Sequence, residues 1–422
     1  MVKYLKKELP SYNLHMIKTD KFKSTYIEVI FNNELKKENI TINNFLSTIL
    51  SYSTKKYNSK TKFARKIEDL YAANIFASGY RLGKLYNVDF NMRVLNDKYT
   101  EKGLFEKAID FLHEILFNPN VKNGEFDENS FLVIKNNEKS QIERFKEDQR
   151  GYAGLKLLEY YNCEEPFSYN LKGYIEDLEK ITPKNLYDYY KEFIKCNNID
   201  IFIIGDIDFD YTEKVVSNKI KFDNKKEKQK EFIIEFKKHR KKVQEIIEND
   251  NTNQAKLSIA CSLEDLTKYE KSYVINIYNL ILGGNADSKF FKNIREKFSL
   301  CYYALTSANK LDNIMVISSG INKENYSKMM ILIKKEMKDM QKGNFTLEDV
   351  EKAKKYYISA LDEIEDNPNQ IIASYYAMDK LGVDDLETRK KKIKEVTKEE
   401  IQLLANKVFI DTIYLLGGDK KW

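Results

Sequence analysis

Arg295 and Tyr302 are the two residues of this sequence whose side chains could do chemistry on a carbonyl group. A guanidinium fork and a phenol are strong hydrogen-bond donors, and both can stabilise negative charge on a carbonyl oxygen. They lie in a segment from Gly283 to Ala308, in which the capping residue Ser288 predicts a short basic helix followed by a strand beginning at Tyr302. The residue types leave a second interpretation open, in which Arg295 pairs with a nearby acid and Tyr302 packs at the strand end.

Histidines and cysteines are too sparse to suggest a metal site. The chain has 3 His and 4 Cys, and none stands at the i, i+3 or i+4 spacing that puts two ligands on one helical face. His113 stands among apolar residues, which favours a partly buried structural role. The polar N-terminal residues give no secretory leader pattern, and the separated cysteines suit a reduced compartment, so we expect a cytoplasmic protein. The positions are His15, His113, His239, Cys163, Cys196, Cys261 and Cys301.

The composition is that of an ordered, helix-rich protein. Hydrophobic residues make up 42% and charged residues 32% of the 422 residues, with only 5 prolines. The formal net charge of +6 comes from 71 basic and 65 acidic residues, so neither sign dominates and no nucleic-acid partner is expected. No run of about 18 apolar residues occurs, so no membrane span is expected either.

Hydrophobic periodicity predicts strands and helices that alternate along the chain. Residues 25–30 alternate as in a strand with one buried face, and a helix follows from about Thr41. The apolar run from Ile199 to Ile204 is typical of a strand buried on both faces. Further strands are expected near residues 75–80, 86–94 and 313–319, and long helices over residues 125–158, with a break near Gly151, and over residues 347–364.

The order of elements in the first half repeats in the second half. A Thr-capped helix and a strand ending in Gly-Asp run from Thr182 to Asp206, and the same pattern runs from Thr397 to Asp419. The offset of about 215 residues is far above solenoid periods, so we expect a duplicated domain. We predict an α+β fold of two α/β sandwich halves, residues 1–223 and 243–422, each an antiparallel-rich mixed sheet packed against helices.

A charged stretch, residues 224–242, separates the two halves. We expect a solvated interdomain linker there, with a short strand-like segment at Phe232–Ile234, because acidic residues are mixed among the lysines. A basic binding patch is the alternative interpretation, although no aromatic stacking platform accompanies the lysines.

Over nearly its whole length the chain resembles the insulinase-like metallopeptidases of the pitrilysin and mitochondrial-processing-peptidase type. One departure is Ser299, where the family usually has Gly. The resemblance implies that Arg295 and Tyr302 contact the substrate backbone and stabilise the oxyanion at a zinc site held by other residues. It rests on the duplicated halves and on residues at the family's signature spacing, namely Gly283, Gly284, Ser288, Phe291, Arg295, Glu296, Lys297, Leu300 and Tyr302.

The family's zinc motif, His-x-x-Glu-His on the first helix, is missing from this chain. The matching positions hold Asn44, Ser47 and Thr48, so both imidazoles and the general base are lost. In the family, a carboxylate from a distant helix completes the zinc site. The resemblance places this carboxylate near residues 141–143, where Glu143 alone could not hold zinc. With no His or Lys base beside Ser47 and Thr48, a serine-type hydrolase is not expected. We expect no metal and no other cofactor in this chain.

The resemblance implies a subunit of a heterodimeric bacterial zinc peptidase. In that arrangement a zinc-bearing paralogue holds the metal, and this chain supplies Arg295 and Tyr302; a homodimer is the other assembly considered. Peptide substrates are expected to add a strand to a sheet edge, since backbone pairing tolerates many sequences. The alternative is an inactive scaffold of the same clamshell fold that binds a peptide or protein, a kind of relative associated with elongation factor P modification. An active peptidase that uses unrelated residues is the least favoured reading.

Overall fold

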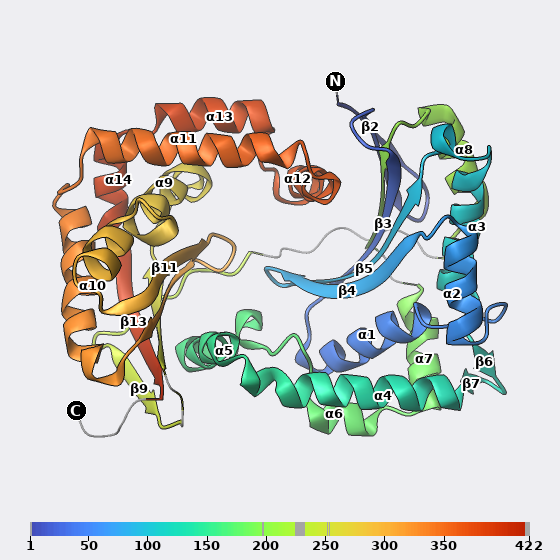
Figure 1. The fold of residues 1–422 in the computed structure, drawn as a ribbon, viewed down its shortest axis with the longest axis horizontal. Helices are drawn as coiled ribbons and strands as arrows, with labels where there is room; N and C mark the ends of the chain where they lie inside the picture. The colour runs from blue at the N-terminus through green and yellow to red at the C-terminus, as the bar shows by residue number, and fades with distance from the viewer. Residues whose placement is uncertain (1, 196–197, 224–232, 251, 253, 418–422) are drawn as a thin grey trace. The chain divides into compact units, whose positions relative to one another are not determined.

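The computed structural model describes residues 2–195, 198–223, 233–250, 252 and 254–417, and the chain divides into two compact units (Figure 1). Unit 1 comprises residues 1–145 and 170–232, and unit 2 comprises residues 146–169 and 233–422. The predicted first domain, residues 1–223, differs from unit 1 at residues 146–169, which pack within unit 2.

Unit 1 is built on a mixed sheet with the strand order β1-β2-β8-β3-β5-β4. Strands β2 and β8 run parallel, and the other neighbours are antiparallel. The alternation predicted for residues 25–30 falls in β3, where Ile27, Val29 and Phe31 are buried. The strands are β1 (Lys3–Glu8), β2 (Asn13–Lys18), β3 (Ser24–Glu34), β4 (Asn74–Leu82), β5 (Leu85–Leu95) and β8 (Asn198–Gly205), with a small hairpin of β6 (Val121–Lys122) and β7 (Glu125–Phe126).

The helices of unit 1 pack against its sheet: α1 and α3 contact β5, and α8 contacts β2 (Figure 1). They are α1 (Lys37–Leu50), α2 (Lys60–Asp69), α3 (Leu104–Phe117), α4 (Glu128–Glu143), α6 (Ile175–Lys180), α7 (Pro183–Phe193) and α8 (Phe209–Lys219). The long helix predicted over residues 125–158 is interrupted by a 3₁₀ turn, Arg144–Glu147. The break therefore precedes Gly151. The Gly151 N–H donates to the side chain of Asp148 at 3.0 Å, and Asp148 thereby caps the start of α5.

Unit 2 repeats the topology of unit 1, as the sequence predicted. Its strand order, β11-β12-β10-β13-β9, matches β4-β5-β3-β8-β2, and the parallel pair β13–β9 matches β8–β2. Thr182 and Thr397, which begin α7 and α14, each form a capping box. The strands are β9 (Gln244–Glu248), β10 (Ala255–Leu263), β11 (Cys301–Asn309), β12 (Ile314–Ile321) and β13 (Val408–Leu416).

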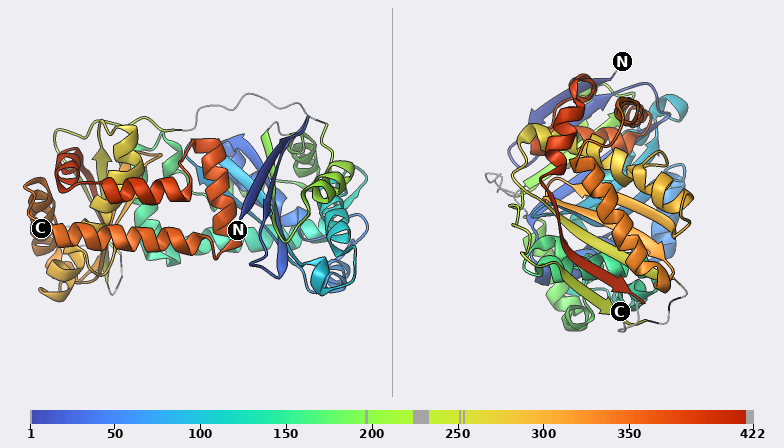
Figure 2. Two further views of the ribbon diagram at one scale, coloured as in Figure 1. Left: turned by 90° about the horizontal axis from the view of Figure 1, so that it is seen from above. Right: turned by 90° about the vertical axis from the view of Figure 1, so that its left-hand side faces the viewer.

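In unit 2, α5 (Gln149–Asn162) packs against β10 and β13, although it comes from the first half of the sequence. The helices from the second half, yellow to red in Figure 2, include α9 (Ile275–Asn279), α10 (Tyr326–Gln341), α11 (Leu347–Ile364), α12 (Pro368–Leu381), α13 (Leu386–Glu395) and α14 (Lys398–Ala405). Two π-helical turns, Glu270–Val274 and Leu280–Gly284, flank α9. Among the helices described in either unit, none has the length and apolar composition that crossing a bilayer requires.

Residues 233–242, the described part of the predicted linker, fall in unit 2, and most of them are exposed. Residues 224–232 lie outside the described residues, and Ile233 and Ile234 are not in a strand. Ile234 is buried; its N–H donates to the Leu311 carbonyl at 3.0 Å, and its carbonyl accepts from Asn313 at 2.6 Å. The predicted strand-like segment is therefore wrong at these two residues.

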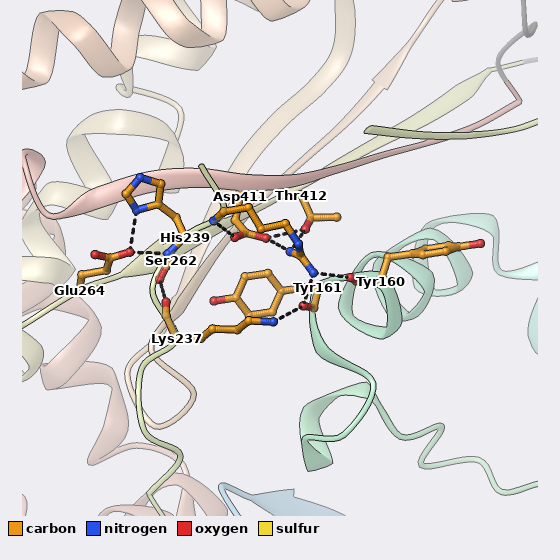
Figure 3. Close-up of polar contacts among 9 residues, drawn as sticks. Tyr160, Tyr161, Lys237, His239, Ser262, Glu264, Asp411 and Thr412 are labelled. Atoms are coloured by element: carbon orange, nitrogen blue, oxygen red, sulfur yellow. Dashed lines mark hydrogen bonds and ion pairs between the residues drawn. The ribbon is translucent and has the colours of Figure 1, made fainter. Parts of the chain in front are cut away.

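Arg240 anchors residues 233–242 to the sheet and to α5, and Figure 3 labels its partners Tyr160, Tyr161, Asp411 and Thr412. Its guanidinium donates to the buried carboxylate of Asp411, to the Thr412 hydroxyl at 2.8 Å, and to the carbonyls of Tyr160 and Tyr161 at 3.1 and 2.9 Å. Arg240, one of the charged residues that suggested a solvated linker, thus satisfies buried polar groups. The sequence pattern could not reveal this, because Asp411 lies far along the chain.

Candidate functional site

The segment from Gly283 to Ala308 forms a short helix and then β11, as predicted. The Ser288 hydroxyl accepts from the Phe291 N–H at 3.3 Å and so caps the helix. Residues Phe290–Glu296 are π-helical, a rare geometry that often occurs at functional sites. The turn that follows places Ser299 at φ 50°, in the left-handed region that glycine adopts most easily. Ser299 is the position where the family pattern has Gly.

Tyr302 is the extra residue of a β-bulge at the start of β11. Cys301 pairs with Ile321 and Tyr303 pairs with Gly320, so no residue of β12 stands opposite Tyr302. Strand β11 ends the sheet order of unit 2, and the Tyr302 side chain is 69% exposed. The bulge therefore presents the phenol to solvent instead of packing it at the strand end.

Arg295 lies close to Tyr302 and is only weakly paired. Its Nε stands 3.8 Å from a carboxylate oxygen of Glu296, and both side chains are well exposed, so the ion pair contributes little. Its guanidinium carbon lies 4.6 Å from the centre of the Phe291 ring. Stacking of this kind fixes the guanidinium plane and leaves its N–H edge for in-plane acceptors.

Arg295 and Tyr302 share a shallow hollow of about 420 Å³, which is also lined by Glu296, Ser299, Leu300, Cys301 and Asn322. Burial raises the pKa of the Cys301 thiol, and a hydrogen bond from Ser319 and the charge of Arg295 offset this only in part. The thiol therefore stays protonated at neutral pH and is a poor nucleophile. The hollow offers donors to acceptor groups, with no activated nucleophile among its lining residues.

The three positions that the resemblance matches to the zinc motif lie on α1 in unit 1, where they take part in a hydrogen-bond network. Asn44 donates to the Leu171 carbonyl at 2.8 Å, and its side-chain oxygen accepts from the hydroxyl of Tyr86 on β5. The buried Ser47 donates to the Asn44 carbonyl at 2.9 Å, so its hydroxyl is engaged within the helix.

Thr48 completes the network by contacting α4. Its hydroxyl donates to a carboxylate oxygen of Glu138 at 3.0 Å. Burial raises the pKa of Glu138, against the effect of the Thr48 hydrogen bond and of the charge of Lys172. Glu138 is therefore a carboxylate of α4 that faces α1, whereas Glu143, within the range 141–143 where the distant carboxylate was expected, is exposed and lies 3.9 Å from Lys139.

The position of Glu138 had a signal in the sequence that periodicity could have found. Glu138 falls on the same helical face as Phe131 and Ile134, which are buried in α4. A charged residue on an apolar face requires a polar partner, and Thr48 is that partner here. Tyr86 carried no comparable signal, since a tyrosine in a strand is common.

This donor set does not fit zinc. An amide, two hydroxyls and one carboxylate lack the imidazole or thiolate ligands that zinc sites in proteins use. The side chains of Asn44 and Thr48 are instead satisfied by Tyr86, Leu171 and Glu138.

The three histidines make other contacts within their own units. His15 is buried and lies 2.8 Å from the Tyr4 hydroxyl and 3.1 Å from Asp200. His113 packs on Phe117, with ring centres 4.8 Å apart, in keeping with its predicted structural role. His239 hydrogen-bonds Glu264 at 2.8 Å.

Comparison with known proteins relates this architecture to one family. A family model described as the peptidase M16 inactive domain matches residues 180–357. The chain is similar to the probable inactive metalloprotease YmfF of Bacillus subtilis, with 26% identity over 99% of this chain and 98% of that protein. It is also similar to the crystal structure of a conserved protein from Enterococcus faecalis, with 26% identity, a TM-score of 0.91 and 99% of each chain covered.

A peptidase M16 inactive domain from Pseudomonas fluorescens shares the fold, with a TM-score of 0.79 and 16% identity over 99% of this chain and 98% of that chain. The predicted α+β architecture of two mixed sheets packed against helices is confirmed by these solved structures. The predicted resemblance to the insulinase-like peptidases, without their zinc motif, is confirmed as well.

Proposed function

We propose that this chain, which is similar to inactive members of the insulinase-like M16 metallopeptidases, binds extended peptides without cutting them. One observation carries the proposal: at the zinc-motif positions, Asn44 and Thr48 are engaged with Tyr86 and Glu138. Groups held in this way cannot activate a water molecule, whereas the surfaces that would contact a peptide remain accessible.

Strand β4 is the surface in unit 1 that suits an extended peptide. It ends the strand order of the sheet, and among the described strands its one neighbour is β5. It also lies beside the zinc-motif positions, since a Cβ placed on Gly79 would stand 3.1 Å from the side-chain oxygen of Asn44. An exposed strand edge can pair with a peptide backbone, and Phe76, 48% exposed, offers an apolar contact.

Peptides with selectively methylated backbones test this mode of binding. A peptide that is N-methylated at every second residue loses the backbone donors of one edge, and its isomer methylated at the other residues loses those of the opposite edge. We expect one isomer to bind the purified chain like the unmodified peptide and the other to bind at least about 10-fold more weakly. Equal affinities for the two isomers would rule out strand addition.

A cleavage assay tests the absence of catalysis. The isolated chain is incubated with quenched fluorescent peptides, with and without added zinc. We expect binding, measured by fluorescence anisotropy, and no cleavage. Zinc-dependent hydrolysis by the isolated chain would overturn the proposal.

A second candidate is a subunit that completes the active site of a zinc-bearing paralogue. The observation that favours it is the exposure of Arg295 and Tyr302, which side by side could donate to a substrate carbonyl. Mixing the chain with such a paralogue should then produce peptide cleavage, and Arg295→Ala or Tyr302→Phe should lower turnover by about 10- to 1000-fold. If the mixture only binds peptides, the scaffold function stands, and elongation factor P and its modifying enzymes become partners to test in pull-down experiments.

A further inference from the structure

The solvent side of α10 in unit 2 gathers lysines around an exposed isoleucine. Ile331 is 67% exposed. Successive residues of an α-helix are about 100° apart, so four exposed lysines fall within about 60° of Ile331 on either side. Lys328, Ile331, Lys334, Lys335 and Lys338 form what we call the basic face of α10. The helix buries its other side in the core of unit 2 through Met329, Leu332, Ile333, Met337 and Met340.

Most ammonium groups on the basic face lack an acidic partner. Lys335 pairs with Asp339 at 3.0 Å. Within the part of the chain that the structure describes, no ion pair or hydrogen bond engages the ammonium groups of Lys328, Lys334 and Lys338. The basic face therefore keeps a positive charge that its own surroundings do not neutralise.

Two features of this face weaken the helix that carries it. Lys334 and Lys338 stand four residues apart, and like charges at this spacing repel each other. Lys328 lies in the first turn of α10, where the helix dipole disfavours a cation. Lysines at the same spacing on other helices face an acid, in the pairs Lys139–Glu143, Lys184–Asp188 and Lys352–Glu348. Charges that cost a helix stability favour a role in binding over one in folding.

Phe298 extends the surface beyond the first turn of α10. It lies in the turn after the π-helical residues Phe290–Glu296 and is 39% exposed. The Nζ atoms of Lys328 and Lys297 stand 5.3 and 5.7 Å from the centre of its ring. A second exposed apolar side chain thus stands among cations.

The two apolar side chains decide which kind of acidic partner fits. A nucleic-acid backbone offers phosphates but no apolar contact for Ile331. Two ammonium groups already approach the Phe298 ring, so it is a poor platform for stacking a base. Binding in a membrane surface needs a broad apolar helix face, and α10 buries that face in unit 2. A protein segment can supply both acids and an apolar side chain.

We infer that the basic face of α10, together with Phe298, binds an acidic segment of a partner protein that carries an apolar residue among its acids. Lys328 and Lys338 are separated by about 15 Å along the helix axis, which corresponds to about three turns of an acidic partner helix. The inference goes beyond the proposed function, because the basic face lies in unit 2 and strand addition to β4 takes place in unit 1.

Three labelled helical peptides of equal length test the inference by fluorescence anisotropy with the full chain. The first carries glutamates around a central leucine. The second has glutamine in place of each glutamate, and the third has alanine in place of the leucine. At low salt we expect the first peptide to bind at least about 10-fold more tightly than either of the others, and its affinity to fall as salt is added.

Variants on the basic face assign the binding to α10. Lys334→Gln combined with Lys338→Gln should weaken the first peptide by about 10-fold, and Ile331→Ser should abolish the difference between the first and third peptides. Lys352→Gln removes a lysine of α11 that pairs with Glu348 at 2.7 Å, and it should change none of the affinities. Because the two lysines of α10 repel each other, replacing both should not lower the melting temperature of the chain.

Duplex DNA and vesicles of phosphatidylcholine with phosphatidylserine are the competing probes. If either binds the chain more tightly than the first peptide does, and the double lysine variant weakens it, the face has a different partner and the inference fails. Equal affinities for the three peptides, or affinities that the variants on α10 leave unchanged, also overturn it. The peptides methylated on their backbones test strand addition to β4 separately, so either proposal can fail without the other.

Discussion

The hydroxyl of Thr48 donates a 3.0 Å hydrogen bond to the buried carboxylate of Glu138. The bond joins α1 to α4. A hydroxyl–carboxylate contact thus links α1 and α4, the two helices on which the resemblance places the zinc ligands. Glu138 is therefore the residue to examine in any attempt to restore the metal site.

Restoring two histidines should create a zinc site that uses Glu138. Asn44→His and Thr48→His would project two imidazoles from one face of α1, at i and i+4, with the carboxylate of Glu138 beside the second. We expect the double variant to retain one zinc ion per chain after dialysis, as measured by metal analysis, and the wild-type chain to retain none.

Two carboxylate variants provide the control for the restored site. In the double-histidine background, Glu138→Gln should weaken zinc binding by at least about 10- to 100-fold, because it removes a ligand. Glu143→Gln should have no effect, since Glu143 is exposed and pairs with Lys139. The reverse result would show that the distant carboxylate had been correctly expected at residues 141–143.

Replacing Ser299 by glycine should stabilise the chain. Ser299 has a φ of 50°, a conformation that is strained for a residue with a Cβ. We expect Ser299→Gly to raise the free energy of unfolding by about 0.5–1 kcal/mol, measured by urea denaturation. Ser299→Ala removes the same hydroxyl but keeps the Cβ, so it should not raise the free energy of unfolding. An equal increase in both variants would mean that the hydroxyl, and not the Cβ, causes the effect.

Much of the fold could be predicted because its signals are local. The alternation over residues 25–30, the apolar run of β8 and the caps at Thr182 and Thr397 each depend on neighbouring residues, and the structure confirms all of them. The duplication followed from comparing such local patterns. The spacing of the Arg295 and Tyr302 segment likewise predicted its helix and strand correctly.

The failures concern contacts between residues far apart in sequence. In the sequence, Arg240 is one of several basic residues in a charged stretch, and nothing there indicates its ion pair with Asp411. The assignment of α5 to unit 2 depends on its packing against β10 and β13, which its own sequence does not encode. The stacking of Arg150 on Tyr303 escaped prediction for the same reason.

Stability should fall as the pH rises, in part because of Glu28 on β3. Burial, and then the charge of Asp89, raise the pKa of Glu28 to about 8, whereas a free glutamate titrates near about 4.3. Between these values the folded chain keeps a proton that the unfolded chain has released, so the folded state loses stability through this window. Asp89, whose pKa burial also raises, acts in the same direction.

Glu28→Gln isolates this contribution. Relative to the wild-type chain, the free energy of unfolding of the variant should increase by about 1–3 kcal/mol between about pH 5 and about pH 9, measured by urea denaturation. Glu68→Gln, which replaces an exposed carboxylate on α2, is the control and should follow the wild-type profile. If the free energy of unfolding changed equally with pH in all three proteins, Glu28 would not be the source of the pH dependence.

Removing Arg240 should destabilise unit 2 more than removing it together with its partner. Arg240→Met leaves the buried Asp411 carboxylate without its cation, at a cost of about 3 kcal/mol or more. Arg240→Met combined with Asp411→Asn should cost less, because no buried charge then remains. Hydrogen exchange should show residues 233–242 and the end of α5 losing protection in Arg240→Met. Lys237→Met, which loses a 3.4 Å bond to the Tyr161 carbonyl, should change little, and an equal cost for the two single variants would mean that Arg240 is not the anchor.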